Sequence, residues 1–323
     1  MSSTSNFPGG FSGGVTIQNV PINIPHPGRV FWVNNSSVLS EGGISGSNSN
    51  PGTFRQPFGT LDYAVGQCKA NRGDVIYIMP GYTQDMDAAD DVDVDVAGVR
   101  IIGLGSGALR PKFTYSNAAG EFVIGADQVR IENLWFVPSV TAVTHAIDVE
   151  TGNQDFQMVN CEFSGREAAG DEFNAAITVT ASCPNGLIQG CYFDSSTDQA
   201  IYGISLNTPT NWWILDNTIV GDYSTACIGT ITGAGVGCRM FRNVIVNGHP
   251  GDLAANVEVF TQSAAGTWLL GENIFATNIT TDLSLMFTNF TSTVNLGNLY
   301  TDDTTMALTA HHLSAVLAVS ADA

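Results

Sequence analysis

A degenerate repeat runs through most of this 323-residue chain. Seven segments place Leu, Cys or Asn at the fourth position and a large apolar residue at the sixth, and all but the last begin with an apolar residue. They read IENLWF (131–136), MVNCEF (158–163), IQGCYF (188–193), ILDNTI (214–219), MFRNVI (240–245), LGENIF (270–275) and NLGNLY (295–300). Their fourth positions are spaced by 25 to 30 residues, a period typical of stacked supersecondary units.

The repeating unit is predicted to be a coil of β-strands. Apolar residues alternate within the segments instead of recurring at the helical spacing, and the Gly, Asn, Asp, Ser and Thr between them are typical of turns. A second strand series has the same period and is centred on Ile147, Ile177, Ile204, Ile231 and Val257. Two series with one period predict an all-β parallel solenoid whose coils lie about 4.8 Å apart. Leu104 and Ile78 extend the register towards the N-terminus and bring the prediction to about nine coils.

Equivalent residues of successive coils lie over one another in a solenoid, so the fourth position should form a column. Four of its members are predicted to form a hydrogen-bonded ladder of side-chain amides: Asn217, Asn243, Asn273 and Asn298. The earlier members of the column are apolar side chains: Leu134, Cys161 and Cys191. The preceding position brings Asp216, Arg242 and Glu272 onto successive coils, which predicts an exposed ion-pair ladder of little energetic weight.

The chain is predicted to hold one solenoid flanked by two terminal segments. Residues 57–300 form the solenoid, and a capping helix at 60–72 covers its first coil, with Thr60 as the N-cap and Gly73 as the stop signal. Residues 301–323 are predicted to cap the other end, because an open end must be covered. Residues 1–56 lack a buried period and are predicted to be an extended attachment arm with a lead-in. The expected apolar anchors of the arm are Phe7, Phe11, Ile22, Ile24 and Pro25.

The composition excludes several classes of partner. The formal charge is −19, with 11 Lys and Arg residues against 30 Asp and Glu residues, and nucleic-acid binding requires a basic surface. No apolar run approaches the roughly 18 residues of a membrane span, and the N-terminus lacks the pattern of a secretory signal. None of the six cysteines stands in a CxxC pair, so buried thiols are expected in a protein made in a reducing cytoplasm.

The segment GTFRQPFGTLDYAVGQCKANRGDVIYIMPGYTQ (52–84) resembles the opening of right-handed parallel β-helix proteins of the pectin-lyase-like superfamily. In those proteins a helix beginning Pro-Phe-x-Thr leads into a strand of the type Gly-Asp-x-Ile-Tyr. Together with GGVTIQNVPI (13–22) and GRVFWVNN (28–35), the opening is similar to proteins encoded among the structural genes of tailed bacteriophages. The resemblance implies a right-handed coil and suits enzymes and structural proteins alike, since one fold hosts many functions.

Glycosidases of this family use paired carboxylates on adjacent coils, and the chain offers several acids in the corresponding region. They are Asp171 with Glu172, Asp194 with Asp198, Asp216 and Asp222. Most lie at predicted turns, so solvated turn residues are the preferred interpretation. A lyase would need calcium-binding acids and a basic residue to take the proton, and Arg166, Arg239 and Arg242 are the basic residues of the middle coils. No catalytic residue, cofactor or metal ligand is therefore predicted.

Two features leave alternatives open. Residues 85–96, DMDAADDVDVDV, contain six aspartates and are interpreted as a solvated edge of strand and turn, with calcium binding as the alternative. A groove lined by tryptophans would suit a glycan, although Trp135 and Trp213 stand on or beside apolar strands and are expected in the core. The tryptophans of such a groove would be Trp135, Trp212, Trp213 and Trp268.

These features favour a structural function without catalysis. The expected protein is a capsid decoration or cement protein that stands on a phage head as a parallel homotrimer, the oligomeric state that the resemblance implies. Its arm would clamp neighbouring subunits of the major capsid protein at the virion surface, after assembly in the cytoplasm of the bacterial host. The alternative is a tailspike or tail-fibre domain that binds or hydrolyses a host surface polysaccharide.

Overall fold

The computed structural model describes residues 15–17, 20–22, 28–35, 45–164, 170–248, 258–277, 286–289 and 293–302. These residues are almost entirely strand and turn, with a short α-helix and one 3-10 turn, η1 (Gly107–Leu109). Strands β1 (Val15–Ile17) and β2 (Val20–Ile22) form an antiparallel hairpin. The other strands belong to two large sheets.

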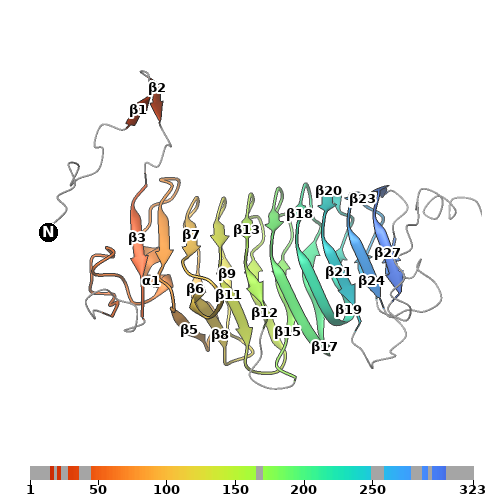
Figure 1. Ribbon diagram of the computed structural model, residues 1–323, viewed down its shortest axis with the longest axis horizontal. Helices are drawn as coiled ribbons and strands as arrows, with labels where there is room; N and C mark the ends of the chain where they lie inside the picture. The colour runs from red at the N-terminus through yellow and green to blue at the C-terminus, as the bar shows by residue number, and fades with distance from the viewer. Residues whose placement is uncertain are drawn as a thin grey trace, which may run out of the picture.

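The first is a ten-stranded sheet that takes one strand from each successive coil of a rod (Figure 1). Its strands are β3 (Val30–Val33), β4 (Val75–Ile78), β7 (Arg100–Gly103), β10 (Arg130–Glu132), β13 (Gln157–Val159), β16 (Leu187–Gln189), β18 (Trp213–Leu215), β20 (Val236–Phe241), β23 (Thr267–Gly271) and β26 (Val294–Leu296). Successive strands pair in parallel. The predicted all-β parallel solenoid is confirmed. Strand β3 adds a coil before the first predicted one, so the sheet begins before residue 57.

The second sheet has fifteen strands and forms the rest of each coil. One ladder comprises β5 (Thr83–Met86), β8 (Lys112–Tyr115), β11 (Trp135–Pro138), β14 (Glu162–Phe163), β17 (Tyr192–Asn207), β19 (Thr218–Thr232), β21 (Val244–Asn247), β24 (Ile274–Thr277) and β27 (Leu299–Asp302). The other comprises β6 (Val92–Asp93), β9 (Phe122–Ile124), β12 (Val143–Val149), β15 (Phe173–Val179), β22 (Glu258–Gln262) and β25 (Phe287–Thr288). The long strands β17 and β19 pair in both ladders and join them.

The predicted register of the second strand series is right in its first half and wrong in its second. Ile147, Ile177 and Ile204 are paired in successive strands. Ile204 then pairs with Ile228, whereas the predicted Ile231 is 49% exposed. The β17–β19 ladder contains register shifts, so a constant spacing cannot carry the alignment across it. Phe260 follows Ile228 in the column, and the predicted Val257 lies outside the described residues.

The sixth position of the repeat points into the rod and forms its core. The rings of Phe136, Phe163 and Phe193 are stacked, with neighbouring centroids 4.9 and 4.8 Å apart. The same position in the later coils is also buried and is occupied by Ile219, Ile245, Phe275 and Tyr300. One coil alone would expose this face to water, so the stacking of neighbouring coils buries the core.

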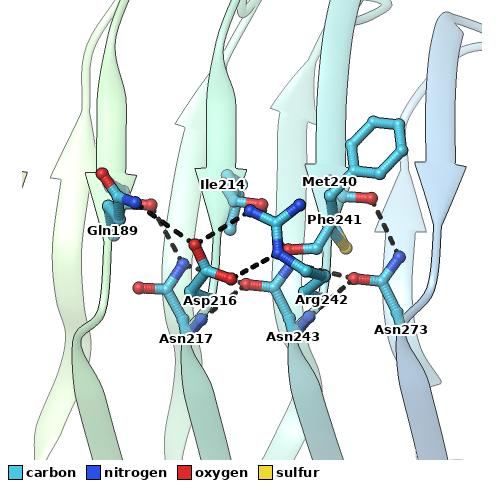
Figure 2. A network of polar contacts seen from close by, with 10 residues as sticks. Gln189, Ile214, Asp216, Asn217, Met240, Phe241, Arg242, Asn243 and Asn273 are labelled. Carbon is cyan, nitrogen blue, oxygen red and sulfur yellow. Dashed lines mark hydrogen bonds and ion pairs between the residues drawn. The ribbon is translucent and has the colours of Figure 1, made fainter.

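An asparagine ladder lies inside the bend that follows the later strands of the ten-stranded sheet (Figure 2). The amide nitrogens of Asn217, Asn243 and Asn273 each donate to Oδ1 of the next asparagine, at 3.0, 2.9 and 2.8 Å. The last acceptor in the series is Oδ1 of Asn298. The backbone N–H groups of the first three donate to the same oxygens. All four side chains are buried, so the ladder satisfies polar groups that have no access to water.

The residue before each column member adopts the left-handed backbone conformation that turns the chain out of the sheet. φ lies between 53° and 66° at Asn133, Asn160, Gly190, Asp216, Arg242, Glu272 and Gly297. Arg242 donates to Asp216 at 2.6 and 3.0 Å, and this hydrogen bonding lowers the pKa of the Asp216 carboxyl (Figure 2). Within the described residues no ion pair joins Arg242 to Glu272, so the predicted three-residue ladder is a single exposed pair.

We expect Glu272→Gly to stabilise the protein by about 0.5–1 kcal/mol. A residue with a Cβ in the left-handed region costs about 1–2 kcal/mol, which glycine avoids. Glycine also has greater conformational freedom in the unfolded chain, and this offsets part of the stabilisation. Glu272 is exposed, with φ at 56°, so few contacts are lost. Urea denaturation measures the change, and Glu162→Gly, within strand β14, should instead destabilise. A destabilised Glu272→Gly variant would contradict the assignment of strain to this turn.

A helix and a buried aspartate organise the N-terminal end of the rod. Helix α1 (Leu61–Gly66) is shorter than the predicted 60–72, and Thr60 caps it by accepting a hydrogen bond from the N–H of Tyr63 at 3.4 Å. Asp74 follows, fully buried, and accepts from the Arg72 guanidinium at 2.7 and 2.6 Å. It also accepts from the backbone N–H groups of Arg29 and Lys69, which ties the first strand segment to the second.

We expect Asp74→Asn to destabilise the protein by about 3 kcal/mol at pH 7, as for the loss of a buried ion pair. Burial alone would raise the pKa of the Asp74 carboxyl, but the hydrogen bonds from Arg72, Arg29 and Lys69 outweigh it and hold the pKa below its ordinary value. Because the pKa of Asp74 is lower in the folded protein than in the unfolded chain, its carboxylate stabilises the fold. This contribution is fully present above the unfolded pKa of about 3.9, and it is lost as the pH falls through the lower pKa of the folded protein. The difference from wild type should therefore be constant between pH 7 and 5 and shrink below about pH 4.

Denaturation midpoints at these pH values measure the difference. Asp90→Asn, in an exposed turn, is the matched control and should behave as wild type. A difference that stayed constant down to pH 2.5 would show that the Asp74 charge contributes nothing to stability.

Candidate binding face on the ten-stranded sheet

The outward side of the ten-stranded sheet carries the candidate site. Side chains alternate across a strand, so in β10 the central Ile131 is buried while Arg130 and Glu132 point outward. The register aligns the first outward positions in one row, of which Val75 is buried: Val30, Val75, Arg100, Arg130, Gln157, Leu187, Trp213, Arg239, Leu269 and Val294. The second row is Trp32, Tyr77, Ile102, Glu132, Val159, Gln189, Leu215, Phe241, Gly271 and Leu296. We call these two rows the sheet face.

The sheet face has the opposite charge balance from the rest of the chain. It holds three arginines and one carboxylate, Glu132, whereas the whole chain has 11 basic and 30 acidic residues. Among the remaining positions most are apolar. The face is therefore a surface that an acidic partner can approach with less repulsion than the net charge of the chain implies.

Two arginines lie side by side near one end of the sheet face. Arg130 donates through Nε and Nη2 to Glu132, at 3.3 and 3.1 Å, and through Nη1 to Oε1 of Gln157 at 2.9 Å. Arg100 is its partner in the neighbouring strand, is exposed, and has no hydrogen bond or ion pair from its side chain to any described residue. The two arginines border a shallow hollow that is open to solvent. Its lining residues are Gly98, Arg100, Gln128, Arg130, Asp155 and Gln157.

Aromatic and aliphatic side chains flank the arginine pair along the sheet face. Trp213 is 40% exposed, and its ring lies 4.3 Å from the guanidinium of Arg239. On the other side of the arginine pair, the ring of Trp32 has its centroid 5.0 Å from that of Tyr77 and 4.9 Å from that of Phe54. Aromatic residues and arginine are enriched in protein interfaces, while Lys, Asp and Glu are depleted. The composition of the sheet face follows that pattern.

Some of the carboxylates considered as catalytic candidates are buried and others are exposed. Asp171, Glu172 and Asp222 are buried, so the interpretation as solvated turn residues was wrong for them. Oε2 of Glu172 accepts a hydrogen bond from the hydroxyl of Ser195 at 2.9 Å, which fixes the carboxylate inside the coil. Asp194 is exposed, Asp216 is paired with Arg242, and the side chain of Asp198 lies outside the described part of the structure.

The four tryptophans do not line one groove. Trp212 and Trp268 are buried in the core, and the indole N–H of Trp212 donates to the carbonyl of Cys183 at 2.6 Å. Trp135 is half-buried and donates to the carbonyl of Ser164 at 2.7 Å. Trp213, which was expected in the core, is exposed because it holds the outward position before Ile214.

A group of titratable side chains lies on the second strand series and was not identified from the sequence. His145 Nε2 lies 2.6 Å from Glu121 Oε1. Burial raises the pKa of the nearby Asp148 carboxyl, and Glu121 and Glu150 raise it further against the opposing effect of His145. A Cβ on Gly125 would lie 3.0 Å from Asp93 Oδ1 and 3.3 Å from Glu150 Oε2, so acids of separate coils border one glycine. The alternation of apolar and acidic residues in VDVDV (92–96) and HAIDVE (145–150) is the signal from which these acids could have been placed on the outward side.

No three His, Cys, Asp or Glu side chains of the described residues converge as metal ligands, and these residues include all of the aspartates at 85–95. All six cysteines are free thiols, and five of them are buried. No helix in the described part of the chain is long and apolar enough to span a membrane. The predicted arm anchors Phe7, Phe11, Ile24 and Pro25 lie outside the described residues, and Ile22 is placed only as the last residue of β2.

Comparison with known proteins identifies the fold but no family. No family model matches the chain, and no curated protein matches it in sequence. A solved rhamnogalacturonan lyase is similar in structure, with a TM-score of 0.56 and 13% identity over 77% of this chain and 68% of the lyase chain. A GH136 lacto-N-biosidase from Eubacterium ramulus aligns with a TM-score of 0.42 and 12% identity over 77% of this chain and 56% of its own. At these identities the likeness to the lyase shows the β-helix fold alone.

Proposed function

We propose that this protein is a structural component of a phage virion, whose β-helix rod docks onto an acidic protein surface through the sheet face. The observation that supports docking is the reversed charge balance of that face, combined with its exposed Trp213 and its flanking apolar residues. The virion assignment rests on the resemblance of residues 13–22, 28–35 and 52–84 to structural proteins of tailed bacteriophages. A basic and aromatic strip on a molecule of net charge −19 suits a protein partner that presents carboxylates. The N-terminal arm would hold the rod to the major capsid protein, as a decoration or cement protein on the virion surface.

Association into a parallel homotrimer is part of the same proposal. The sheet face is not the expected trimer contact, because three-fold symmetry would bring copies of Arg100 and Arg130 towards one another. Native mass spectrometry tests the oligomeric state, and a trimer should persist when Trp213 is replaced by serine.

Docking is tested with virions that lack the protein. Wild-type protein should bind them in a sedimentation assay, Trp213→Ser with Arg239→Gln should bind at least tenfold more weakly, and the surface variant Tyr192→Ser should bind as wild type. Deletion of residues 1–29 tests the arm, since binding that survives truncation would rule out attachment through it. Electron cryomicroscopy of the decorated particle then locates the rod, and its absence from both head and tail would end the virion proposal.

A glycan-acting function is the second candidate, and the acids Asp148, Glu121 and Glu150 of the second strand series favour it. A carboxyl with a raised pKa, such as Asp148, is suited to act as a general acid beside an ionised carboxylate. The fold is shared with a rhamnogalacturonan lyase. Purified protein is incubated with bacterial capsule or lipopolysaccharide and assayed for new reducing ends. Release that disappears in Asp148→Asn would replace the non-enzymatic proposal, and no release from either protein would leave it standing.

A further inference from the structure

We propose that the hollow between Arg100 and Arg130 is a carboxylate-binding site, which takes an Asp or Glu side chain of the protein that docks on the sheet face. The inference rests on the proposed function and names the chemistry of the partner. Its starting point is the pairing of β7 with β10, which places Arg100 directly opposite Arg130. Neighbouring strands lie about 4.8 Å apart, and like charges in opposite positions destabilise a sheet.

The hydrogen-bond donors of the hollow are incompletely used. A guanidinium carries five N–H donors in a planar fork that matches a carboxylate. The guanidinium of Arg130 donates hydrogen bonds to Glu132 and Gln157, whereas the guanidinium of Arg100 donates to no acceptor among the described residues. The amide of Gln128 lines the same hollow. An incoming carboxylate can therefore accept hydrogen bonds from the unused donors of Arg100.

The acids beside the hollow select for a singly charged ligand. Asp155 lines the hollow and forms no ion pair with either arginine, and Glu132 is already bound to Arg130. Two arginines against two carboxylates leave no net charge, so the guanidinium of Arg100 can match the single charge of a carboxylate, whereas the second charge of a phosphate dianion has no partner here. The hollow thus favours a side-chain carboxylate over a phosphate group.

The surroundings favour a protein as the source of that carboxylate. The sheet face continues on both sides of the hollow with aromatic and aliphatic positions, from Trp32 and Tyr77 to Leu187 and Trp213. A protein segment that places an acid between apolar side chains would contact all of these at once. A free ion would use only the hollow.

Binding is measured on the full-length protein, with arginine labelled by ¹⁵N, at 150 mM salt and matched ionic strength. The probes are a hexaglutamate peptide, inorganic phosphate and polygalacturonate. Hexaglutamate should shift the Nε–H resonances of Arg100 and Arg130, and Arg100→Gln should weaken it at least fivefold. Lys112→Gln, which removes one positive charge from β8 of the fifteen-stranded sheet, outside the sheet face, should bind within twofold of wild type. Because Arg100 is exposed, Arg100→Gln should fold, with a thermal midpoint at or above that of wild type.

Three results would overturn the inference. Equal losses in Arg100→Gln and Lys112→Gln would mean diffuse electrostatic attraction. Binding of phosphate more tightly than hexaglutamate would rule out a site selective for carboxylates. Binding of polygalacturonate more tightly than hexaglutamate would mean a glycan ligand. Particle sedimentation separates this inference from the proposed function. If Arg100→Gln loses hexaglutamate but binds particles as wild type, the partner assignment fails and docking stands. If wild-type protein binds hexaglutamate as expected but no particle, docking fails and the carboxylate site stands.

Discussion

Asn243→Ala is expected to destabilise the protein by about 4 kcal/mol, because it leaves several buried polar groups without partners. Oδ1 of Asn243 accepts from both the backbone N–H and the amide of Asn217, at 2.9 and 3.0 Å. Its own amide donates to Asn273 and to the carbonyl of Ile214, each at 2.9 Å. Each buried group that loses its partner costs about 1–3 kcal/mol, and the losses fall on three successive coils. Urea denaturation followed by circular dichroism measures the change.

Two comparison variants separate the hydrogen bonds from the space that the side chain fills. Asn243→Leu fills the column as Leu134 does in an earlier coil, so it should recover little stability if the unpaired groups are the cause. Asn117→Ala, in an exposed turn where the side chain accepts a hydrogen bond from Ala119, should cost less than about 1 kcal/mol. An Asn243→Leu variant as stable as wild type would show that packing, and not the ladder, maintains this column.

The coil architecture could be predicted because a solenoid converts sequence spacing directly into spatial neighbours. The fourth position of the repeat predicted the asparagine ladder without any knowledge of the turns, and the phenylalanine rings at the sixth position are stacked in the same register. The predicted register fails between strands β17 and β19. Their pairing contains register shifts, so the number of residues between equivalent positions changes there. There Ile228 replaced the expected Ile231. Local irregularities of this kind leave no mark on the apolar pattern.

The candidate site was harder to predict because it depends on which of two adjacent residues faces outward. Trp212 and Trp213 are neighbours with the same chemistry, yet one is buried and the other exposed, since a shift of one residue reverses the faces of a strand. The signal was nevertheless present. Arg100 and Arg130 each stand four residues before a column member, Leu104 and Leu134, so the same register that predicted the coils also places these arginines side by side.

Phe163→Ala is expected to destabilise the protein by about 3–5 kcal/mol, the cost of removing a large aromatic side chain from a packed core. Phe163 is 2% exposed and lies between the rings of Phe136 and Phe193, with interplanar angles of 14° and 4°. Phe163→Leu conserves most of the volume and should cost less than about 1.5 kcal/mol. Tyr192→Ala, on the exposed residue next to Phe193, is the control and should stay within about 0.5 kcal/mol of wild type. Urea denaturation measures all three variants.

The double variant Phe163→Ala with Phe193→Ala shows whether the stack acts as a unit. If the rings contribute only by burial, the two single costs should add, apart from the cavity that they share. Stacked rings in direct contact should instead show a coupling of about 0.5–1.5 kcal/mol, so that the double variant is less destabilised than the sum. The ring centroids are 4.8 Å apart, which equals the spacing of neighbouring strands, so the fold itself holds this contact in place. Strict additivity would mean that each coil buries its own phenylalanine independently and that the stack adds no cooperativity along the rod.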